Sequence, residues 1–183
     1  MTTDNKDNKL SIGSGDYAEI LRHAVAVIEH ARTEIAQHVN GYVSTAYWEI
    51  GQMLHERKIE SGYGDSVVKR LSADLKERYP KMGVSPRNLW DMKKFYERFC
   101  HSDIKVRQAV ALLPWGHILR LLQRVGDDDA AMLFYAKETR SKGWNRDLLL
   151  NAIKLKMYET KALTQVDNNF DRTLPAEQAQ YAN

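Results

Sequence analysis

The chain has 183 residues, 43% of them hydrophobic, which is enough to build a packed core in one ordinary domain or two small ones and excludes global disorder. Its formal net charge of +3 is mildly basic, so it permits a nucleic-acid partner without demanding one. The single cysteine, Cys100, excludes an internal disulfide and a multi-cysteine zinc site, and it fits a reducing compartment.

Residues 1–15 are polar and contain almost nothing that a core could bury, so we expect them to form a flexible arm. They lack the apolar centre of a signal peptide. No stretch of the chain approaches the roughly 18 uninterrupted apolar residues that a membrane span needs. These features predict a cytoplasmic protein with no membrane partner.

The first predicted helix begins after Asp16, which can cap it, and its apolar residues recur at alternating spacings of three and four. This stripe consists of Leu21, Ala24, Ile28, Ala31 and Ile35. The spacing is heptad-like and fits two arrangements. The helix is either one member of a bundle or a dimer interface formed by Leu21, Ile28 and Ile35, since two clean heptads are too few to identify a coiled coil.

Gly41 is expected to interrupt or bend this helix. The apolar pattern resumes at Tyr42 and continues to about residue 58. A glycine-containing turn at residues 61–65 then precedes a helix over about 65–79, which the following proline and glycine end.

Residues 86–99 form the next predicted helix, with Ser85 as its N-cap and Pro86 at its first position, where a missing N–H costs nothing. Further helices are predicted over about 104–111 or onward through Pro114 to residue 125, from residues 127–129 to Gly143, and from Asn145 to about residue 157. No strand pattern is found, so the predicted fold class is all-α, a multi-helix bundle over residues 16–159. Residues 160–183 are polar and are predicted to be a linker or tail.

The helix over residues 86–99 separates an apolar side from a basic side. At about 100° per residue, one arc of about 120° contains Leu89, Met92, Phe95, Tyr96 and Phe99. The opposite side contains Arg87, Asp91, Lys94 and Arg98, with Trp90 and Glu97 at its edge. The apolar side is expected to anchor the helix in a core, while the other side offers three cations beside a large aromatic ring.

Positive charge is concentrated around this helix. Residues 65–98 hold nine Lys/Arg against five Asp/Glu, a balance of +4 that exceeds the +3 of the whole chain. A helix, a turn and a second basic helix are typical of a helix-turn-helix DNA reader, so we predict such a pair here. The predicted DNA-binding residues are Lys69, Arg70, Arg87, Lys94 and Arg98 for phosphates, Asn88 for a base edge, and Trp90 for stacking or packing.

A solvated or partner-binding surface is the other interpretation of these charges. Any amphipathic surface helix carries charges on its outer side, and the turn YPKMGVS is longer than the three or so residues of a compact helix-turn-helix. Trp90 argues against plain solvation, because an indole on a polar face usually has something to cover it.

No catalytic constellation is found in the sequence. None of the six histidines has a familiar metal-binding spacing, and no phosphate-binding glycine loop occurs. Residues 103–105 match the D-x-K fragment of metal-dependent nucleases, but they lie among predicted helices and not at a strand edge. The chain on its own is therefore not predicted to be an enzyme, and no catalytic residue, metal ligand or cofactor is assigned to it.

Six stretches, taken together and in order, resemble the N-terminal helical domain of YhcG-like bacterial proteins. They are YWEIGQML (47–54), SGYGDSVVKRLSADLKERYP (61–80), SPRNLWDMKKFYERF (85–99), LPWGHILRLL (113–122), FYAKETRSKGWNRDLLLNAI (134–153) and NFDRTLPA (169–176). The resemblance implies a C-terminal nuclease domain of the PD-(D/E)XK type after the linker that NFDRTLPA begins. That domain would supply the metal-binding acids and the lysine, and a divalent metal is expected only there.

No such nuclease motif follows before Asn183, so the chain is expected to be a fragment or a truncated form, and no catalytic residue carries over from the family. The resemblance implies that the helical domain is the DNA-recognition or assembly part. We therefore predict a DNA-binding or assembly module of a nuclease that is non-catalytic by itself. The alternative is a dimerisation or protein-interaction scaffold whose first two helices pair with a second copy, without DNA contact.

Overall fold

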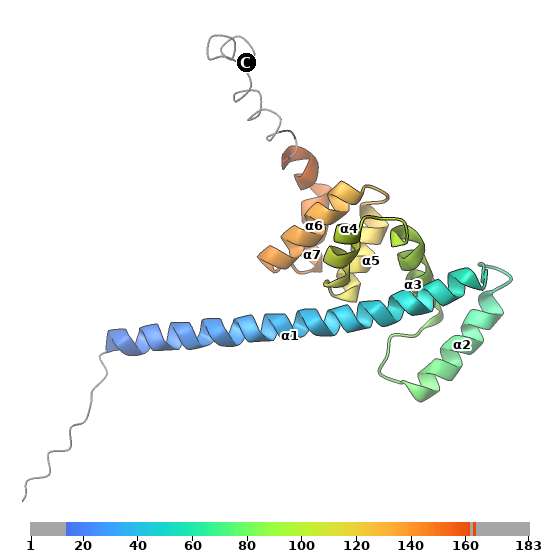
Figure 1. Cartoon of the computed structure of the whole chain (residues 1–183), viewed down its shortest axis with the longest axis horizontal. Helices are drawn as coiled ribbons and strands as arrows, with labels where there is room; N and C mark the ends of the chain where they lie inside the picture. Colours follow the sequence, from blue (N-terminus) through green and yellow to red (C-terminus); the bar gives the residue numbers. More distant parts are fainter. Residues whose placement is uncertain (1–13, 162, 164–183) are drawn as a thin grey trace, which may run out of the picture. The chain divides into compact units, whose positions relative to one another are not determined.

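The computed structural model describes residues 14–161 and 163, and this part of the chain contains helices and no strand, which confirms the predicted all-α class (Figure 1). The helices are α1 (Ser14–Glu56), α2 (Asp65–Arg78), α3 (Pro86–Phe99), α4 (Ile104–Ala111), α5 (Trp115–Arg124), α6 (Asp129–Lys142) and α7 (Arg146–Lys154). The backbone is helical again over residues 157–161. Nearly all of the predicted arm and tail lies outside the described residues.

Helix α1 is continuous where the sequence predicted an interruption at Gly41, and that prediction was wrong. A glycine within a helix costs about 1 kcal/mol relative to alanine, and the burial of Tyr47 and Leu54 further along α1 can offset this cost. The helix also begins at Ser14, two residues before the predicted N-cap Asp16.

By compactness the chain divides into two units, residues 1–38 and 39–183, and each is described by itself.

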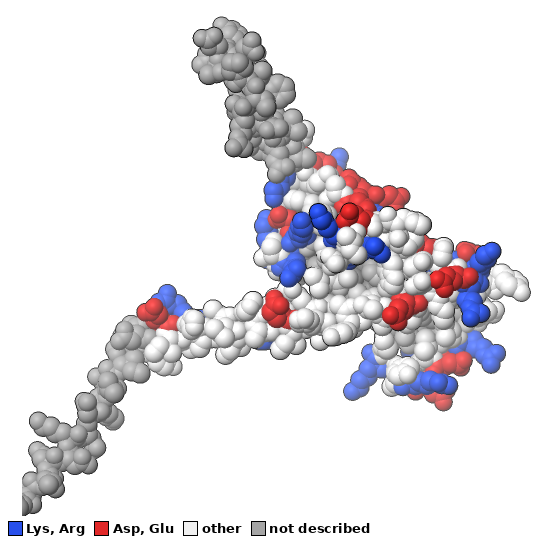
Figure 2. Space-filling model, in the orientation of Figure 1, with Lys and Arg blue, Asp and Glu red and all other residues white. Residues whose placement is uncertain are grey.

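The described part of the first unit is a single helical segment with an exposed apolar stripe. Every side chain from residue 17 to 36 is exposed. Leu21, Ile28 and Ile35 expose 50, 56 and 64% of their surface. The face of α1 that Figure 2 presents is largely without charged side chains. The residues predicted to form a dimer interface therefore have no partner among the described residues.

The second unit has its core around α3. Leu89 and Met92 pack in one buried cluster with Tyr47, Leu54 and Val68. One turn further on, Phe95 and Phe99 belong to a second cluster, which includes Val110, Leu113, Ile118, Leu121, Met132, Tyr135 and Leu149. Four side chains of the predicted apolar arc, Leu89, Met92, Phe95 and Phe99, are each at most 3% exposed, and the fifth, Tyr96, is half-buried. Burying one of them stabilises the fold by roughly 1.5–3 kcal/mol.

Side-chain caps begin several of the helices, and Ser85 was predicted as one of them. Ser85 Oγ accepts a hydrogen bond from the Asn88 N–H, 3.2 Å away, at the start of α3. Asn145 caps α7 and Asp128 caps α6 in the same way. Pro114 is the N-cap of α5, so α4 and α5 are two helices and the longer alternative does not form.

None of the described helices is both long enough and apolar enough to cross a membrane.

Candidate nucleic-acid interface

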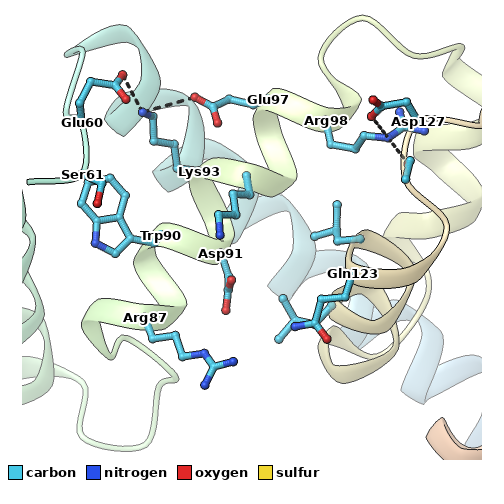
Figure 3. A pocket seen from close by; sticks show the side chains of 14 residues that line it. Glu60, Ser61, Arg87, Trp90, Asp91, Lys93, Glu97, Arg98, Gln123 and Asp127 are labelled. Atoms are coloured by element: carbon cyan, nitrogen blue, oxygen red, sulfur yellow. Dashed lines mark hydrogen bonds and ion pairs between the residues drawn. The ribbon is translucent and has the colours of Figure 1, made fainter. Parts of the chain in front are cut away.

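A groove of about 800 Å³ runs along the polar side of α3, between α5 and the turn at residues 60–61 (Figure 3). Its lining residues are Glu60, Ser61, Arg87, Trp90, Asp91, Lys93, Lys94, Glu97, Arg98, Leu119, Leu122, Gln123, Gly126 and Asp127. Half of them come from α3, because the apolar arc of this helix faces the core and its polar side faces the groove. The groove therefore collects most of the charged residues on which the DNA-binding prediction rests.

Lys93 is compensated within the fold. Its Nζ lies 2.8 Å from Glu60 Oε1 and 3.4 Å from Glu97 Oε1, and its side chain is only 6% exposed. Burial lowers the pKa of Lys93, but the hydrogen bonds and charges of Glu60 and Glu97 outweigh burial and raise this pKa above its ordinary value. Lys93 therefore stays charged and ties α3 to the turn before α2.

Arg98 is also compensated. Its Nε donates to the Gly126 carbonyl oxygen at 2.7 Å, and its Nη1 lies 2.9 Å from Asp129 Oδ1. Asp127 lies 3.3 Å from Nε, and the arginine side chain is 13% exposed. These contacts use Nε and Nη1 of a guanidinium that was predicted to bind phosphate, while its Nη2 is buried without a hydrogen-bond partner among the described residues.

The pKa of the Asp129 carboxylate is lowered by its contacts with Arg98 and Ser102. Burial alone would raise the pKa of Asp129, but the hydrogen bonds from Arg98 and Ser102 and the charge of Arg98 outweigh burial and hold the pKa below its ordinary value. Asp129 lies in the first turn of α6, so the ion pair joins the end of α3 to the start of α6.

The amide of Asn88 is used at both ends. Its Nδ2 donates to the Gly83 carbonyl oxygen, and its Oδ1 accepts from Trp115 Nε1 at 2.7 Å.

Trp90 is half-buried against the cluster around Met92, and the Lys93 ammonium lies 5.8 Å from the centre of the Trp90 ring. Trp90 is thus covered partly by the protein itself, which explains an indole beside a polar face.

Four of the predicted cations have no internal partner. Lys69 and Arg70 on α2 and Arg87 and Lys94 on α3 are exposed. Within the described part of the chain, none of them forms an ion pair. Three acids of the groove, Glu60, Glu97 and Asp127, are thus paired with Lys93 and Arg98. Among the described residues, Arg87, Lys94 and the groove's fourth acid, Asp91, form no ion pair.

A smaller hollow of about 310 Å³ shares Arg87, Asp91, Leu119 and Gln123 with the groove. Arg120 of α5 and Arg146 of α7 also line this hollow. We call this hollow the arginine pocket. Neither arginine was predicted as a binding residue, because both lie outside the basic segment 65–98. Burial lowers the pKa of the neighbouring His117, its hydrogen bond to the Trp144 carbonyl oxygen opposes this, and the charge of Arg146 lowers the pKa further.

The described residues contain no group of three or more His, Cys, Asp or Glu side chains placed to hold a metal ion. Asp103, the acid of the D-x-K fragment, accepts a hydrogen bond from the Lys105 N–H at 2.7 Å and caps α4. Its position is explained by helix capping.

Two comparisons place the chain among known proteins. The sequence model described as the DUF1016 N-terminal domain matches residues 23–160. A protein of Escherichia coli (strain K12) named "Putative nuclease YhcG" is 31% identical over an alignment that covers 81% of this chain and 47% of that protein. The chain thus spans about half the length of this curated relative. No solved structure gives a significant match.

Proposed function

This chain belongs to the DUF1016 N-terminal domain family, and on that premise we propose that it is a cytoplasmic, non-catalytic helical module that binds nucleic acid for a nuclease. The proposal is supported by two cations of the α3 groove that are exposed and form no ion pair, with the unpaired Asp91 between them in the sequence. Arg87 and Lys94 are exposed beside Trp90, while the neighbouring Lys93 and Arg98 are neutralised by acids of the fold. Exposed cations of this kind bind phosphates and release counterions from the nucleic acid.

The proposed contacts are mainly to phosphates. Arg87 and Lys94 form the centre of the surface, and Lys69 and Arg70 extend it along α2. Because Asn88 already uses both ends of its amide, we assign it to holding the turn before α3 and not to reading a base edge. Arg98 and Trp90 are assigned to holding the groove in shape, Arg98 through its ion pair with Asp129 and Trp90 through its packing on the core. Phosphate contacts carry no sequence information directly, so the binding is expected to depend little on sequence.

The variant Arg87→Gln/Lys94→Gln is expected to bind a labelled DNA about tenfold more weakly than the unmodified chain at low salt, because two phosphate contacts are lost. Fluorescence anisotropy with one duplex and one single strand of the same sequence measures this change. The matched control is Lys137→Gln/Arg140→Gln, which removes two exposed cations of α6 that have no ion pair within the described chain. Equal weakening by both variants would show that net charge, and not the groove, governs binding.

Homodimerisation is a second candidate, and the exposed stripe of α1 favours it. Leu21, Ile28 and Ile35 repeat at intervals of seven residues, and Tyr42 extends the series with 77% of its surface exposed. Burying such a stripe against a second copy would remove apolar area from water and satisfy the heptad-like spacing. The two functions are compatible, since the stripe and the α3 groove use different residues.

The variant Ile28→Gln/Ile35→Gln is expected to lower the average mass of the chain in sedimentation at micromolar concentration from that of a dimer to that of a monomer. Both substitutions place amides in the centre of the stripe and cost roughly 1–3 kcal/mol each in a buried interface. His30→Gln/Thr33→Gln, on the opposite face of the same helix, is the control. Circular dichroism verifies that helix content is retained. A mass that is the same for the stripe variant and the unmodified chain would eliminate this dimer.

A further inference from the structure

The arginine pocket brings together cations from three helices. Arg87 comes from α3, Arg120 from α5 and Arg146 from α7. The side chain of Arg146 lies over Gly116, where a Cβ would stand 3.1 Å from its Cδ and 3.5 Å from Nη1. Arg120 follows Gly116 by four residues, so it lies on the same face of α5 one turn later. The pocket therefore places the guanidinium groups of Arg120 and Arg146 along one helix face, opposite the beginning of α3.

The lining of this pocket has a surplus of positive charge. Asp91 is the one acid in it, so three arginines and one aspartate leave +2. No carboxylate of the described residues forms an ion pair with any of the three arginines. In the part of the chain that the structure describes, their side chains make one hydrogen bond, from Arg120 Nη1 to Gln123 Oε1, 3.2 Å away. Arginine does not lose its proton at physiological pH, so this charge and most of the N–H donors are available to an anion.

We infer that the arginine pocket binds the terminal phosphomonoester of a nucleic-acid strand, an inference that relies on the proposed function for the nature of the strand. A guanidinium gives phosphate two parallel hydrogen bonds, and such charge-assisted pairs are the strong ones. A phosphomonoester carries about −1.5 to −2 charges at neutral pH, which complements the +2 of the lining. An internal phosphodiester carries a single negative charge and complements it less well. The uncompensated Arg87 also lines the α3 groove, so a strand end held in the pocket would continue along the proposed binding surface.

The test compares one oligonucleotide that carries a 5′-phosphate, a 3′-phosphate or only hydroxyl ends. We expect the unmodified chain to bind one phosphorylated form about tenfold more tightly than the hydroxyl form. Arg120→Gln/Arg146→Gln should abolish this preference, and Arg120→Lys/Arg146→Lys should lose most of it, because lysine keeps the charge without the bidentate fork. The Lys137→Gln/Arg140→Gln control should retain it. Equal affinity for all three forms, or a preference that survives the Gln variant, would overturn the inference.

A nucleotide titration separates this inference from the proposed function. If no oligonucleotide binds, deoxyadenosine 5′-monophosphate and deoxyadenosine are titrated by calorimetry into the unmodified chain and into Arg120→Gln/Arg146→Gln. Binding of the monophosphate alone, and only by the unmodified chain, would support the pocket while the proposed function fails. No binding of the monophosphate in that case would overturn the pocket as well. Circular dichroism establishes that each variant is folded before it is titrated.

Discussion

Replacement of Gly51 by alanine is expected to lower the free energy of unfolding by about 2–3 kcal/mol, as overpacking of a well-packed core does. Gly51 lies in α1 against α3, and a Cβ at this position would stand 2.2 Å from the backbone oxygen of Met92 and 2.7 Å from its carbonyl carbon. These are backbone atoms and not the end of a flexible side chain, so α1 and α3 would have to move apart. Urea unfolding followed by circular dichroism measures the loss.

Gly41→Ala is the matched control in the same helix. A Cβ at Gly41 would meet Leu112 Cδ2 at 4.0 Å, an ordinary contact. Alanine is the better helix former, so this variant is expected to gain about 0.5–1 kcal/mol. The two substitutions are chemically identical and should change stability in opposite directions. A similar change for both would contradict the close approach of α1 to α3 at Gly51.

Arg98→Met is expected to cost about 2–3 kcal/mol at neutral pH, because it removes the cation paired with Asp129, which keeps its hydrogen bond from Ser102, and leaves the Gly126 carbonyl oxygen without its donor. Arg124→Met, which removes an exposed cation at the end of α5, is the control for lost charge and should change stability by less than about 0.5 kcal/mol. Denaturant unfolding of the two variants beside the unmodified chain measures the difference.

The cost of Arg98→Met should also depend on pH. The pKa of Asp129 in the folded chain lies below its unfolded value of about 3.9, because the hydrogen bonds and charge of Arg98 outweigh burial. A lowered carboxyl pKa contributes stability that is complete above the unfolded pKa and is lost as the pH falls through the folded value. The difference between the unmodified chain and Arg98→Met should therefore be largest at neutral pH and shrink below pH 4, which is about the unfolded pKa. A difference that stays constant from pH 7 to pH 3 would mean that the ion pair contributes little.

Local signals in the sequence predicted much of the second unit. Ser85 and Pro86 define the start of α3, and its buried face follows from a spacing that depends only on helix geometry. The family resemblance, which was based on six stretches, is confirmed by the match over residues 23–160. Capping and periodicity involve residues a few positions apart, which is why the sequence alone suffices for them.

Features that depend on distant residues could not be predicted in this way. Lys93 and Lys94 are neighbours in sequence, yet Lys93 is buried and Lys94 is exposed. Lys93 pairs with Glu60, which lies 33 positions earlier in the chain. The partners of Arg98 are likewise on another element. Arg120 and Arg146 join Arg87 only when α3, α5 and α7 pack together. The charge count of residues 65–98 drew attention to α3 but could not distinguish the cations that form ion pairs from those that do not.

The salt dependence of DNA affinity decides whether the exposed cations Arg87 and Lys94 of the α3 groove bind nucleic-acid phosphates. For duplex DNA the logarithm of the association constant falls against the logarithm of salt concentration with a slope of about −0.9 per phosphate contacted. We predict a clearly negative slope for the unmodified chain and a slope shallower by about two phosphate equivalents for Arg87→Gln/Lys94→Gln. Association that does not change with salt, or identical slopes for the two proteins, would show that Arg87 and Lys94 do not contact DNA phosphates.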